Sequence, residues 1–203
     1  MKAVFFDKDG TLIPDIPYNT DVTRITFTLY VETALERLTK LGYKLFIITN
    51  QPGLAFGRCE ERHLKLVEGK LARMFRANGV RLAGFYYCPH HPDGIVSRYA
   101  LDCECRKPLP GLLYKAAADF GIDLHRSWMV GDILNDVEAG NRAGCKTILL
   151  NNGNETEWLK GPHRSPDYIA DNFLTIGEII ATQSNRRNLH FVHPTQEARY
   201  DHR

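Results

Sequence analysis

The chain has 203 residues and a formal net charge of +2, with the composition of an ordinary globular protein. This length suits one domain with a sizeable core, alone or with a small appendage. The charge is too small to favour a nucleic-acid or membrane-surface partner, and no apolar run approaches the ~20 residues of a membrane helix. The apolar run after Lys2 stops after four residues, which is too short for a signal peptide. We therefore expect a cytoplasmic monomer that binds neither nucleic acid nor membrane.

Short apolar runs that end in turn residues alternate along the chain with amphipathic segments. Such runs predict strands at 2–6, 43–49, 82–88, 127–132 and 146–152. The amphipathic segments predict helices at 27–42, 60–79, 110–121 and 135–144, several of which end at a glycine. Nearly continuous apolar strands that alternate with helices are typical of a parallel sheet covered on both faces. The sequence therefore predicts an α/β fold with a doubly wound parallel sheet.

The alternating pattern decays after about residue 184, where the sequence is polar, basic and rich in histidine. We expect residues 1–183 to form the domain. Residues 184–203 are interpreted as a C-terminal tail without chemistry, packed on the surface or on a neighbouring subunit.

Polar side chains gather where the predicted strands end. They are Asp7 and Asp9 after the first strand, Thr49 and Asn50 at the second, and Asp132 after the fourth. Functional groups of such sheets collect at the carboxyl ends of the strands. With Asp136 and Lys107, the group offers carboxylates that suit Mg²⁺, and a hydroxyl and an ammonium that suit phosphoryl oxygens. Singly, each of these residues could equally be a solvated loop residue.

The first of these segments also invites comparison with a calcium loop. An EF-hand loop that began at Asp7 would need a glycine at position 6 and a glutamate at position 12. Here the glycine falls at position 4 and position 12 is Tyr18, so that interpretation fails.

Four segments, DKDGT, ITN, RKPLPG and GDILND, resemble in order the four motifs of the haloacid dehalogenase superfamily. The match spans residues 5 to about 152. The resemblance implies a phosphate monoester hydrolase in which Asp7 attacks phosphorus and forms an aspartyl-phosphate. It implies that Asp9 protonates the leaving alcohol and then takes a proton from the hydrolytic water.

The remaining roles follow from the same resemblance. Thr49, helped by Asn50, would hydrogen-bond the phosphoryl group, and Lys107 would neutralise its charge. Mg²⁺ would be held by Asp7, the backbone carbonyl of Asp9 and Asp132. Asp136 would be a further ligand or a group that orients the ligands.

Three of the five cysteines fall close together before the third motif. Cys88-x-His90 and Cys103-x-Cys105 offer three thiolates and one imidazole, a natural tetrahedral Zn²⁺ set. A disulfide is the alternative, and the close spacing and the expected reducing compartment disfavour it. His90 fits the spacing better, although the sequence does not exclude His91.

Four protein ligands leave no open position on the metal, so we expect a structural zinc in the loop 88–106. Arg106 and Lys107 follow the last cysteine directly, so the metal would fix the loop that delivers these two cations to the substrate.

The zinc loop resembles that of the D-glycero-D-manno-heptose 1,7-bisphosphate phosphatases and of the related histidinol-phosphate phosphatases. The run from YYCPHHPDG to CRKPLPG is closer to the heptose enzymes. Two departures remove cations near the site, since that family usually has lysine at Ile133 and TNQSGIARG where this chain has Pro52 and Phe56 in TNQPGLAFG. A bisphosphate needs positive charge, so histidinol phosphate or another small phosphoester stays an alternative. An inactive, zinc-stabilised binding protein is the alternative of another class.

The spacing of the motifs leaves no room for a separate cap domain. About forty residues separate Asp9 from Thr49, and much of that length is one helix. We therefore predict a capless enzyme in which the loop 12–25 is a short cover. Within it Tyr18 either touches the substrate or packs in the loop.

Overall fold

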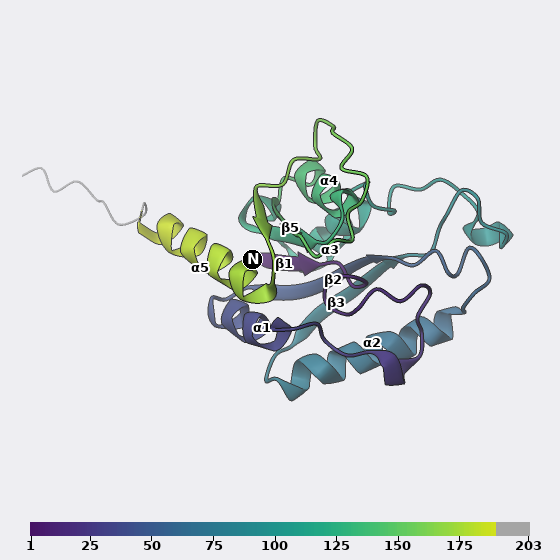
Figure 1. Cartoon of the computed structure of the whole chain (residues 1–203), viewed down its shortest axis with the longest axis horizontal. Coiled ribbons are helices and arrows are strands. Elements are labelled where there is room, and N and C mark those ends of the chain that lie inside the picture. Colours follow the sequence, from purple (N-terminus) through teal and green to yellow (C-terminus); the bar gives the residue numbers. More distant parts are fainter. Residues whose placement is uncertain (190–203) are drawn as a thin grey trace, which may run out of the picture.

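The computed structural model of the chain describes residues 1–189. Six parallel strands form one sheet in the order β3-β2-β1-β4-β5-β6 (Figure 1). The strands are β1 (Ala3–Phe6), β2 (Lys44–Asn50), β3 (Leu82–Cys88), β4 (Trp128–Gly131), β5 (Lys146–Leu150) and β6 (Tyr168–Ala170). The α-helices are α1 (Val31–Lys40), α2 (Glu61–Ala77), α3 (Gly111–Phe120), α4 (Leu134–Arg142) and α5 (Phe173–Leu189). Short 3₁₀ helices span Val22–Arg24, Ser97–Tyr99 and Leu124–Arg126.

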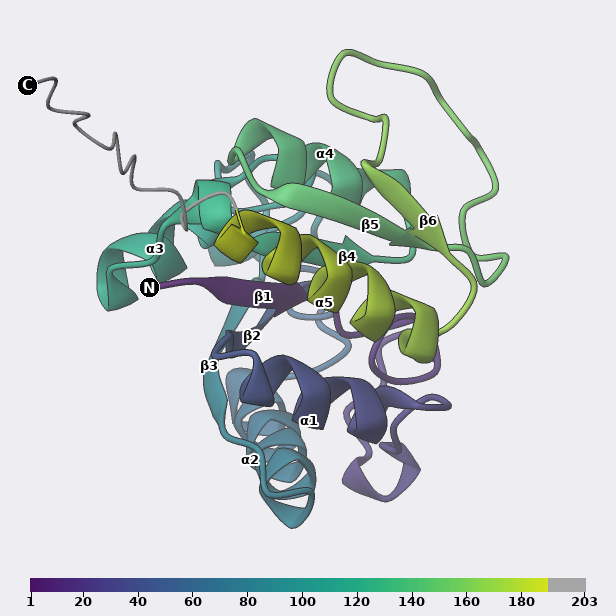
Figure 2. The same cartoon turned by 90° about the vertical axis from the view of Figure 1, so that its left-hand side faces the viewer.

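Helices cover both faces of the sheet, as Figures 1 and 2 show. On β1, Val4 and Phe6 join a buried cluster with side chains of α1, α2 and α5. The alternate residues of β1, Ala3 and Phe5, join a second cluster with α3 and α4. Because successive side chains of a strand point to opposite faces, one apolar strand fills both layers. The predicted α/β fold with a doubly wound parallel sheet is confirmed.

Each strand and helix predicted above is present, with bounds that shift by a few residues. The largest shift is at α1, predicted from residue 27, which begins only at Val31. Tyr30 has a positive φ of 68°, a left-handed conformation that a helix interior does not accommodate. The apolar residues before Tyr30 therefore belong to the preceding loop.

Strand β6 and helix α5 were not predicted. β6 has three residues and its central Ile169 is exposed, so its apolar run is too short to mark a strand in the sequence. In α5 the β-branched residues and Gly177 weaken the helical signal, while Phe173, Ile176 and Ile180 are buried against the sheet.

Helix α5 crosses the predicted boundary between domain and tail at residue 183. Ser184 Oγ donates to Ile180 O at 2.8 Å and lies 2.7 Å from Tyr43 Oη. The division into a domain and a tail stays a prediction, and residues 190–203 of the tail lie outside the described residues.

Strand β1 lies between β2 and β4, which is where the winding of the chain changes direction. From β1 the chain runs outward through β2 and β3, then returns to the other side of β1 and runs outward through β4, β5 and β6. In open α/β sheets the crevice at such a switch point, at the carboxyl ends of the strands, is where ligands bind.

Loops, rather than a cap domain, surround these carboxyl ends. The segment after β2 packs on the segment after β3, where Ala55 O accepts hydrogen bonds from Ile95 N at 2.8 Å and Val96 N at 2.9 Å. Leu54, Leu64 and Tyr99 form a small buried cluster between them. In residues 1–189, no helix has both the length and the apolar composition needed to cross a bilayer.

Candidate active site and metal centre

Asp7 directly follows β1 and is 7% exposed. Its backbone N donates to Val130 O of β4 at 2.9 Å, which fixes it at the switch point. Its Oδ1 accepts from Lys107 Nζ at 2.5 Å. Burial raises the pKa of Asp7 to about 7, with help from the charges of Asp136 and Asp9 and against the effect of Lys107. The carboxylate predicted to attack phosphorus is therefore buried. Neighbouring carboxylates repel its negative charge, and one ammonium, that of Lys107, stabilises it.

Lys107 lies between two carboxylates. Its Nζ is 2.5 Å from Asp7 Oδ1 and 2.5 Å from Asp136 Oδ1, and Ile48 O accepts from it at 3.0 Å. Burial alone would lower the pKa of Lys107, but the charges of Asp136 and Asp7 hold that pKa above its usual range. Lys107 is therefore an ammonium in the folded protein.

Asp136 is fully buried on the first turn of α4. Its Oδ2 accepts from Ile133 N at 3.3 Å, while its Oδ1 faces Lys107 as an ion pair outside hydrogen-bond geometry. Burial raises the pKa of Asp136 and the charge of Lys107 opposes this. The arrangement favours a role in orienting Lys107.

Asp132 follows β4 and has a partner at each carboxylate oxygen. Thr11 Oγ1 donates to Oδ1 at 2.7 Å and Asn154 Nδ2 donates to Oδ2 at 2.7 Å. Burial, followed by the charge of Asp7, raises the pKa of Asp132 to about 6. Two neutral donors thus set the orientation of this carboxylate.

The loop after β5 supplies two residues that the sequence analysis missed. Asn154 holds Asp132, and Asn152 Nδ2 donates to Gly10 O at 2.6 Å, which ties the same loop to the turn after β1. The one available signal was their position just after a strand, at the edge of the sheet where the other polar residues gather.

Asp7, Asp132 and Asp136 each offer an oxygen, and these oxygens lie within 4.8 Å of one another. Three buried carboxylates stand against the single ammonium of Lys107, so the group carries an excess of negative charge. Hard oxygen ligands and excess negative charge suit a divalent cation such as Mg²⁺. The residues present therefore fit the predicted metal.

Asp9 follows Asp7 by two residues and lines the same cavity. The chain turns directly after it at Gly10, whose φ is +79°. Its Oδ1 accepts from Lys8 Nζ at 2.5 Å, and its Oδ2 accepts from Gln51 Nε2 at 2.8 Å. Gln51 Nε2 also donates to Thr49 Oγ1 at 2.9 Å. Gln51 is a further residue that the sequence analysis did not identify.

These groups line a cavity of about 220 Å³ at the switch point. The lining residues are Asp7, Asp9, Asp15, Thr49, Asn50, Lys107, Asp132, Ile133, Asp136 and Asn154. The structure thus brings six of the predicted catalytic, substrate-binding and magnesium residues together with Asp136 in one pocket.

Asn50 lines the cavity, but both polar atoms of its side chain form hydrogen bonds with the backbone of Lys107. Its Oδ1 accepts from Lys107 N and its Nδ2 donates to Lys107 O, each at 3.0 Å. Asn50 therefore fixes the segment that carries Lys107. The predicted contact of Asn50 with substrate stays a prediction.

Arg106 does not line this cavity. It borders a neighbouring hollow beside the zinc loop, which Lys107 also borders. Its Nη1 donates to His90 O at 3.5 Å. A substrate would have to extend from the cavity into that hollow to meet Arg106.

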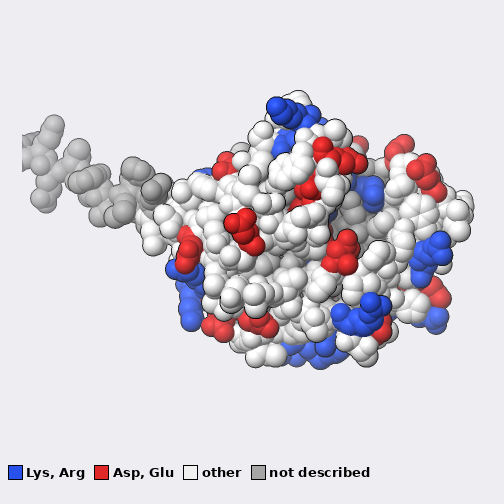
Figure 3. Space-filling view, viewed as in Figure 1, with Lys and Arg blue, Asp and Glu red and all other residues white. Residues whose placement is uncertain are grey.

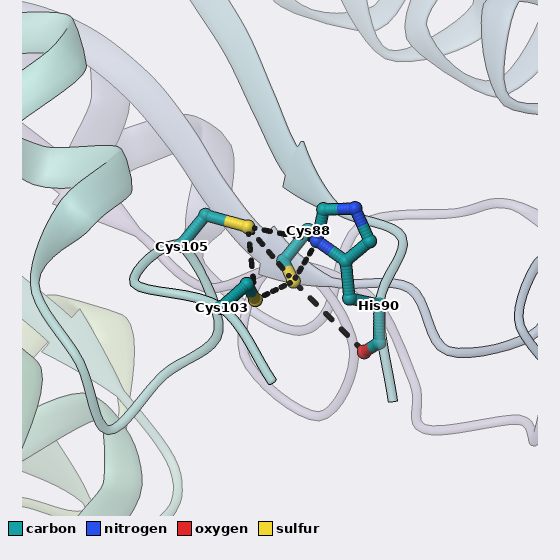
Figure 4. Close-up of side chains that lie close together, drawn as sticks. All are labelled: Cys88, His90, Cys103 and Cys105. Carbon is teal, nitrogen blue, oxygen red and sulfur yellow. Dashed lines mark hydrogen bonds between the residues drawn. The ribbon is translucent and has the colours of Figure 1, made fainter. Parts of the chain in front are cut away.

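The predicted zinc ligands converge at the end of β3 (Figure 4). Cys105 Sγ lies 3.2 Å from Cys88 Sγ, 3.2 Å from Cys103 Sγ and 3.3 Å from His90 Nδ1. The Cys88–Cys103 and Cys88–His90 separations are 3.5 and 3.8 Å. Zn–S bonds of ~2.3 Å in a tetrahedron imply edges of about 3.8 Å, so these separations approach those of a four-ligand zinc site.

His91 lies elsewhere. Its ring packs on Phe56 with the centroids 4.8 Å apart, and its Nδ1 accepts from Asp93 N at 3.2 Å. The geometry thus favours His90 over His91 as the ligand. Hydrogen bonding with the Cys88 and Cys103 thiols, against the effect of burial, lowers the pKa of Cys105 to about 5, which favours a thiolate where a cation would bind.

The zinc loop is joined to the catalytic cavity through β2. Cys88 pairs with Asn50 in the sheet, and Cys88 O accepts from Gln51 N at 2.7 Å. Asn50 also binds the backbone of Lys107. The cysteine cluster is therefore connected to Lys107 in two ways: through Cys88 and Asn50, and along the chain from Cys105.

Tyr18 stands beside the cavity rather than in its lining. Its φ is +54° and its ring packs edge-on against Phe56, with centroids 6.4 Å apart. From the loop 12–25, Asp15 reaches the cavity. A contact between Tyr18 and substrate stays a prediction.

Comparisons with known proteins bear on the same regions. A family model described as HAD-hydrolase-like matches residues 104–176. The D-glycero-β-D-manno-heptose-1,7-bisphosphate 7-phosphatase of Pasteurella multocida is 42% identical over 181 residues, which cover 88% of this chain and 96% of that protein. The D-glycero-α-D-manno-heptose-1,7-bisphosphate 7-phosphatase of Photorhabdus laumondii is 33% identical over 181 residues, 89% of this chain and 97% of that protein.

A solved structure is similar over nearly the whole chain. The crystal structure of the D,D-heptose 1,7-bisphosphate phosphatase of B. bronchiseptica, complexed with magnesium and phosphate, superposes with a TM-score of 0.73. The sequences are 26% identical, and the match covers 90% of this chain and 99% of that one.

Proposed function

The chain belongs to the D-glycero-D-manno-heptose 1,7-bisphosphate 7-phosphatase family of the haloacid dehalogenase superfamily, and we propose that it removes the 7-phosphate of that sugar with Mg²⁺. The observation that supports this proposal most directly is the buried group of Asp7, Lys107 and Asp132 in the switch-point cavity. An inert binding protein would have no need of three buried carboxylates that share one ammonium in such a cavity.

In the first step, an oxygen of Asp7 forms a bond to phosphorus as the bond from phosphorus to the sugar oxygen breaks. Asp9 gives its proton to that sugar oxygen, so the heptose leaves as a neutral alcohol. The product on the protein is an aspartyl-phosphate at Asp7. Lys107, 2.5 Å from Asp7 Oδ1, holds the nucleophile in place and offers positive charge to the transferring group.

In the second step, water attacks the phosphorus of the aspartyl-phosphate. Asp9, now a carboxylate, takes a proton from this water, the bond between phosphorus and Asp7 breaks, and inorganic phosphate leaves. Thr49 faces the cavity and would donate its hydroxyl hydrogen to a phosphoryl oxygen in both steps.

Asp7, Asp132 and the backbone carbonyl of Asp9 would hold Mg²⁺, which when bound lets an anionic carboxylate approach an anionic phosphate. Asp136 would act behind these ligands by orienting Lys107, which agrees with its complete burial. The zinc at Cys88, His90, Cys103 and Cys105 would be structural, because four protein ligands leave no position for substrate.

The departures of this chain from the family pattern affect where the second phosphate of the sugar would lie. Ile133 and Asp15 line the cavity and offer no positive charge. Arg106 borders the hollow on the side of the zinc loop. We propose that the 1-phosphate points toward Arg106.

We further propose a cytoplasmic monomer that acts on a small phosphorylated sugar without nucleic-acid or membrane partners. In support, Lys, Arg, Asp and Glu side chains are interspersed on the face drawn in Figure 3, with no broad patch of one sign.

A phosphate-release assay tests the proposal. The purified, zinc-loaded protein with Mg²⁺ would be given both anomers of the heptose bisphosphate, the heptose 1-phosphate and histidinol phosphate. We expect one bisphosphate anomer to be preferred and one equivalent of phosphate to be released, because only the 7-phosphate is attacked. Asp7→Asn is the control, since a neutral amide of the same shape cannot form the aspartyl-phosphate.

The result would contradict the mechanism if Asp7→Asn kept wild-type turnover. A preference for histidinol phosphate over both anomers of the heptose bisphosphate would contradict the proposed substrate. No hydrolysis of any ester by the wild-type protein would favour the inert binding protein.

A further inference from the structure

Asp9 accepts hydrogen bonds from the nitrogen atoms of two buried side chains. Lys8 Nζ lies 2.5 Å from Oδ1, and Gln51 Nε2 lies 2.8 Å from Oδ2. Both partners are buried, the Lys8 side chain at 1% exposure and Gln51 at 7%. An ammonium and an amide nitrogen do not accept hydrogen bonds. A proton on Asp9 therefore finds no acceptor at either contacting nitrogen, and the cavity that Asp9 lines is where it can be donated.

The same amide nitrogen acts on Thr49. Since Gln51 Nε2 carries two hydrogens, it supplies one to Asp9 Oδ2 and one to Thr49 Oγ1, at 2.9 Å. The Thr49 hydroxyl thus accepts from Gln51 and keeps its own hydrogen. Among residues 1–189, the Thr49 hydroxyl donates to Asn50 O, at the long oxygen–oxygen distance of 3.5 Å. The hydrogen is therefore available to a phosphoryl oxygen in the cavity.

Gln51 itself lies behind the cavity wall and is not among its lining residues. Its backbone N donates to Cys88 O at 2.7 Å, so it is anchored to the strand that begins the zinc loop. When Asp9 is a carboxylate it accepts only, so the side-chain nitrogen of Gln51 faces it, at 2.8 Å from Oδ2.

We propose that Gln51 is a positioning residue that sets two groups at once: the acid–base carboxylate of Asp9 and the hydroxyl hydrogen of Thr49. This inference rests on the proposed phosphatase function, in which both groups act on the phosphoryl group. One buried amide would then fix the position of the group that transfers the proton, Asp9, relative to the group that binds phosphate, Thr49.

The test removes both donations with Gln51→Met, which keeps the length of the side chain. Positioned acid–base groups contribute ~10²–10⁴ in rate, so partial loss of position should lower kcat about tenfold to a hundredfold on a sugar phosphate. KM should change much less. The matched control is Gln183→Met, the same exchange in α5, which should keep the wild-type rate.

Leaving-group dependence separates positioning from a general structural effect. p-Nitrophenolate leaves without needing a proton, so the first turnover of p-nitrophenyl phosphate does not need the acid function of Asp9. Gln51→Met should therefore lose less in that burst than in turnover of the sugar phosphate. Adding Thr49→Val should cost less in Gln51→Met than in the wild type, because the two residues act through one hydrogen bond.

Equal losses with both leaving groups, together with additive effects of Thr49→Val, would overturn the inference. So would wild-type turnover by Gln51→Met. If Gln51→Met did not fold, Gln51→Glu would take its place, since it keeps the shape but presents oxygens to two acceptors. A wild-type protein that hydrolyses neither the sugar phosphate nor the aryl ester would instead overturn the proposed function, and this inference with it.

Discussion

Asp7 and Asp132 bind protons more tightly in the folded protein than free aspartates do. Burial, with the neighbouring carboxylates, raises the pKa of Asp7 to about 7, against Lys107, and that of Asp132 to about 6. Between pH ~4 and ~7 the folded state therefore binds more protons than the unfolded state. The stability from these groups is complete below the pKa of a free aspartate and is lost as pH rises through the folded values.

This linkage predicts how Mg²⁺ and pH act together. In zinc-loaded, magnesium-free protein, the free energy of unfolding that these two groups contribute should fall as pH rises from about 5 to about 7.5. Mg²⁺ should stabilise the protein more at pH 7.5 than at pH 5, because it competes with protons for the same oxygens. Thermal unfolding at a series of pH values, with and without Mg²⁺, measures both effects. An increase in Tm with Mg²⁺ that did not vary with pH would contradict the prediction.

Gly10 is required at its position for two separate reasons. Its φ of +79° is left-handed, and a Cβ there would meet the side chains of Asp132 and Asn154. Gly42 has nearly the same φ, +80°, but a Cβ there would meet nothing within 4 Å. Comparing alanine substitutions at the two positions therefore distinguishes the cost of backbone strain from the cost of a steric clash with Asp132 and Asn154.

Gly42→Ala should therefore cost about 1–2 kcal/mol in the free energy of unfolding, from backbone strain alone. Gly10→Ala should cost more and should also weaken Mg²⁺ binding, because it displaces Asp132. Urea unfolding and magnesium titration of both variants measure the difference. Equal costs, with unchanged Mg²⁺ affinity in Gly10→Ala, would show that the side chains around Gly10 give way freely.

At the scale of elements, a structural zinc in the loop 88–106 would make the position of Lys107 depend on a metal that takes no part in the reaction. Structural zinc binds with ~10–16 kcal/mol, which is comparable with the net stability of a whole domain, ~5–15 kcal/mol. Cys105 stands two residues before Lys107, and Cys88 is the sheet partner of the residue that holds the Lys107 backbone. Loss of zinc should therefore displace Lys107.

We predict that Cys105→Ser loses zinc and loses most of its turnover, even with Mg²⁺ in excess. Cys59→Ser should keep both, since Cys59 lies outside the cluster. Zinc content and kcat are measured on the same samples. Full activity in a sample verified to be free of zinc would contradict the prediction.

The elements that the sequence predicts are those whose apolar residues repeat at a regular spacing. β1 and β3 are found because their runs are short, apolar and bounded by turns. The strand ends then locate Asp7, Thr49 and Asp132 without further information, because parallel strands finish at one edge of the sheet.

The sequence does not predict contacts that depend on how loops fold back. Asn154 reaches Asp132 from a loop 22 residues further along the chain, and an asparagine after a strand has many ordinary uses. Likewise, the spacing leaves His90 and His91 open. They are separated by the contact of His90 Nδ1 with Cys105 Sγ, at 3.3 Å, and by the packing of His91 on Phe56. Gln51 lies in the segment TNQPGLAFG. Its two hydrogen bonds cannot be predicted from that segment, because they exist only once the fold brings Asp9 close to Thr49.

For the whole molecule, α5 completes the core on one face of the sheet. Phe173, Ile176 and Ile180 are at most 1% exposed and join the cluster that contains Phe6. Full burial of three such side chains contributes ~5–9 kcal/mol. That range covers much of the net stability of a domain, so the domain needs its last helix.

Two truncations test this division of the chain. A protein of residues 1–172 should not fold, because it lacks α5. A protein of residues 1–189 should keep wild-type turnover and Tm if the sequence after α5 carries no chemistry, as we predict. Circular dichroism and phosphate release measure the outcome. Lost activity in residues 1–189 would assign a function to the tail.

The position of β1 in the middle of the sheet also decides when the protein can become active during its synthesis. Asp7 is made 123 residues before its backbone partner Val130, and Asn154 must follow before Asp132 has both its donors. Contacts between distant parts of a chain form late, because closing a long loop has to precede them. On the ribosome, Asp7 therefore lacks its complete metal site until residue 154 has been made. A nascent chain can acquire hydrolytic activity only after that point, when it can also bury the carboxylates that the proposed chemistry needs.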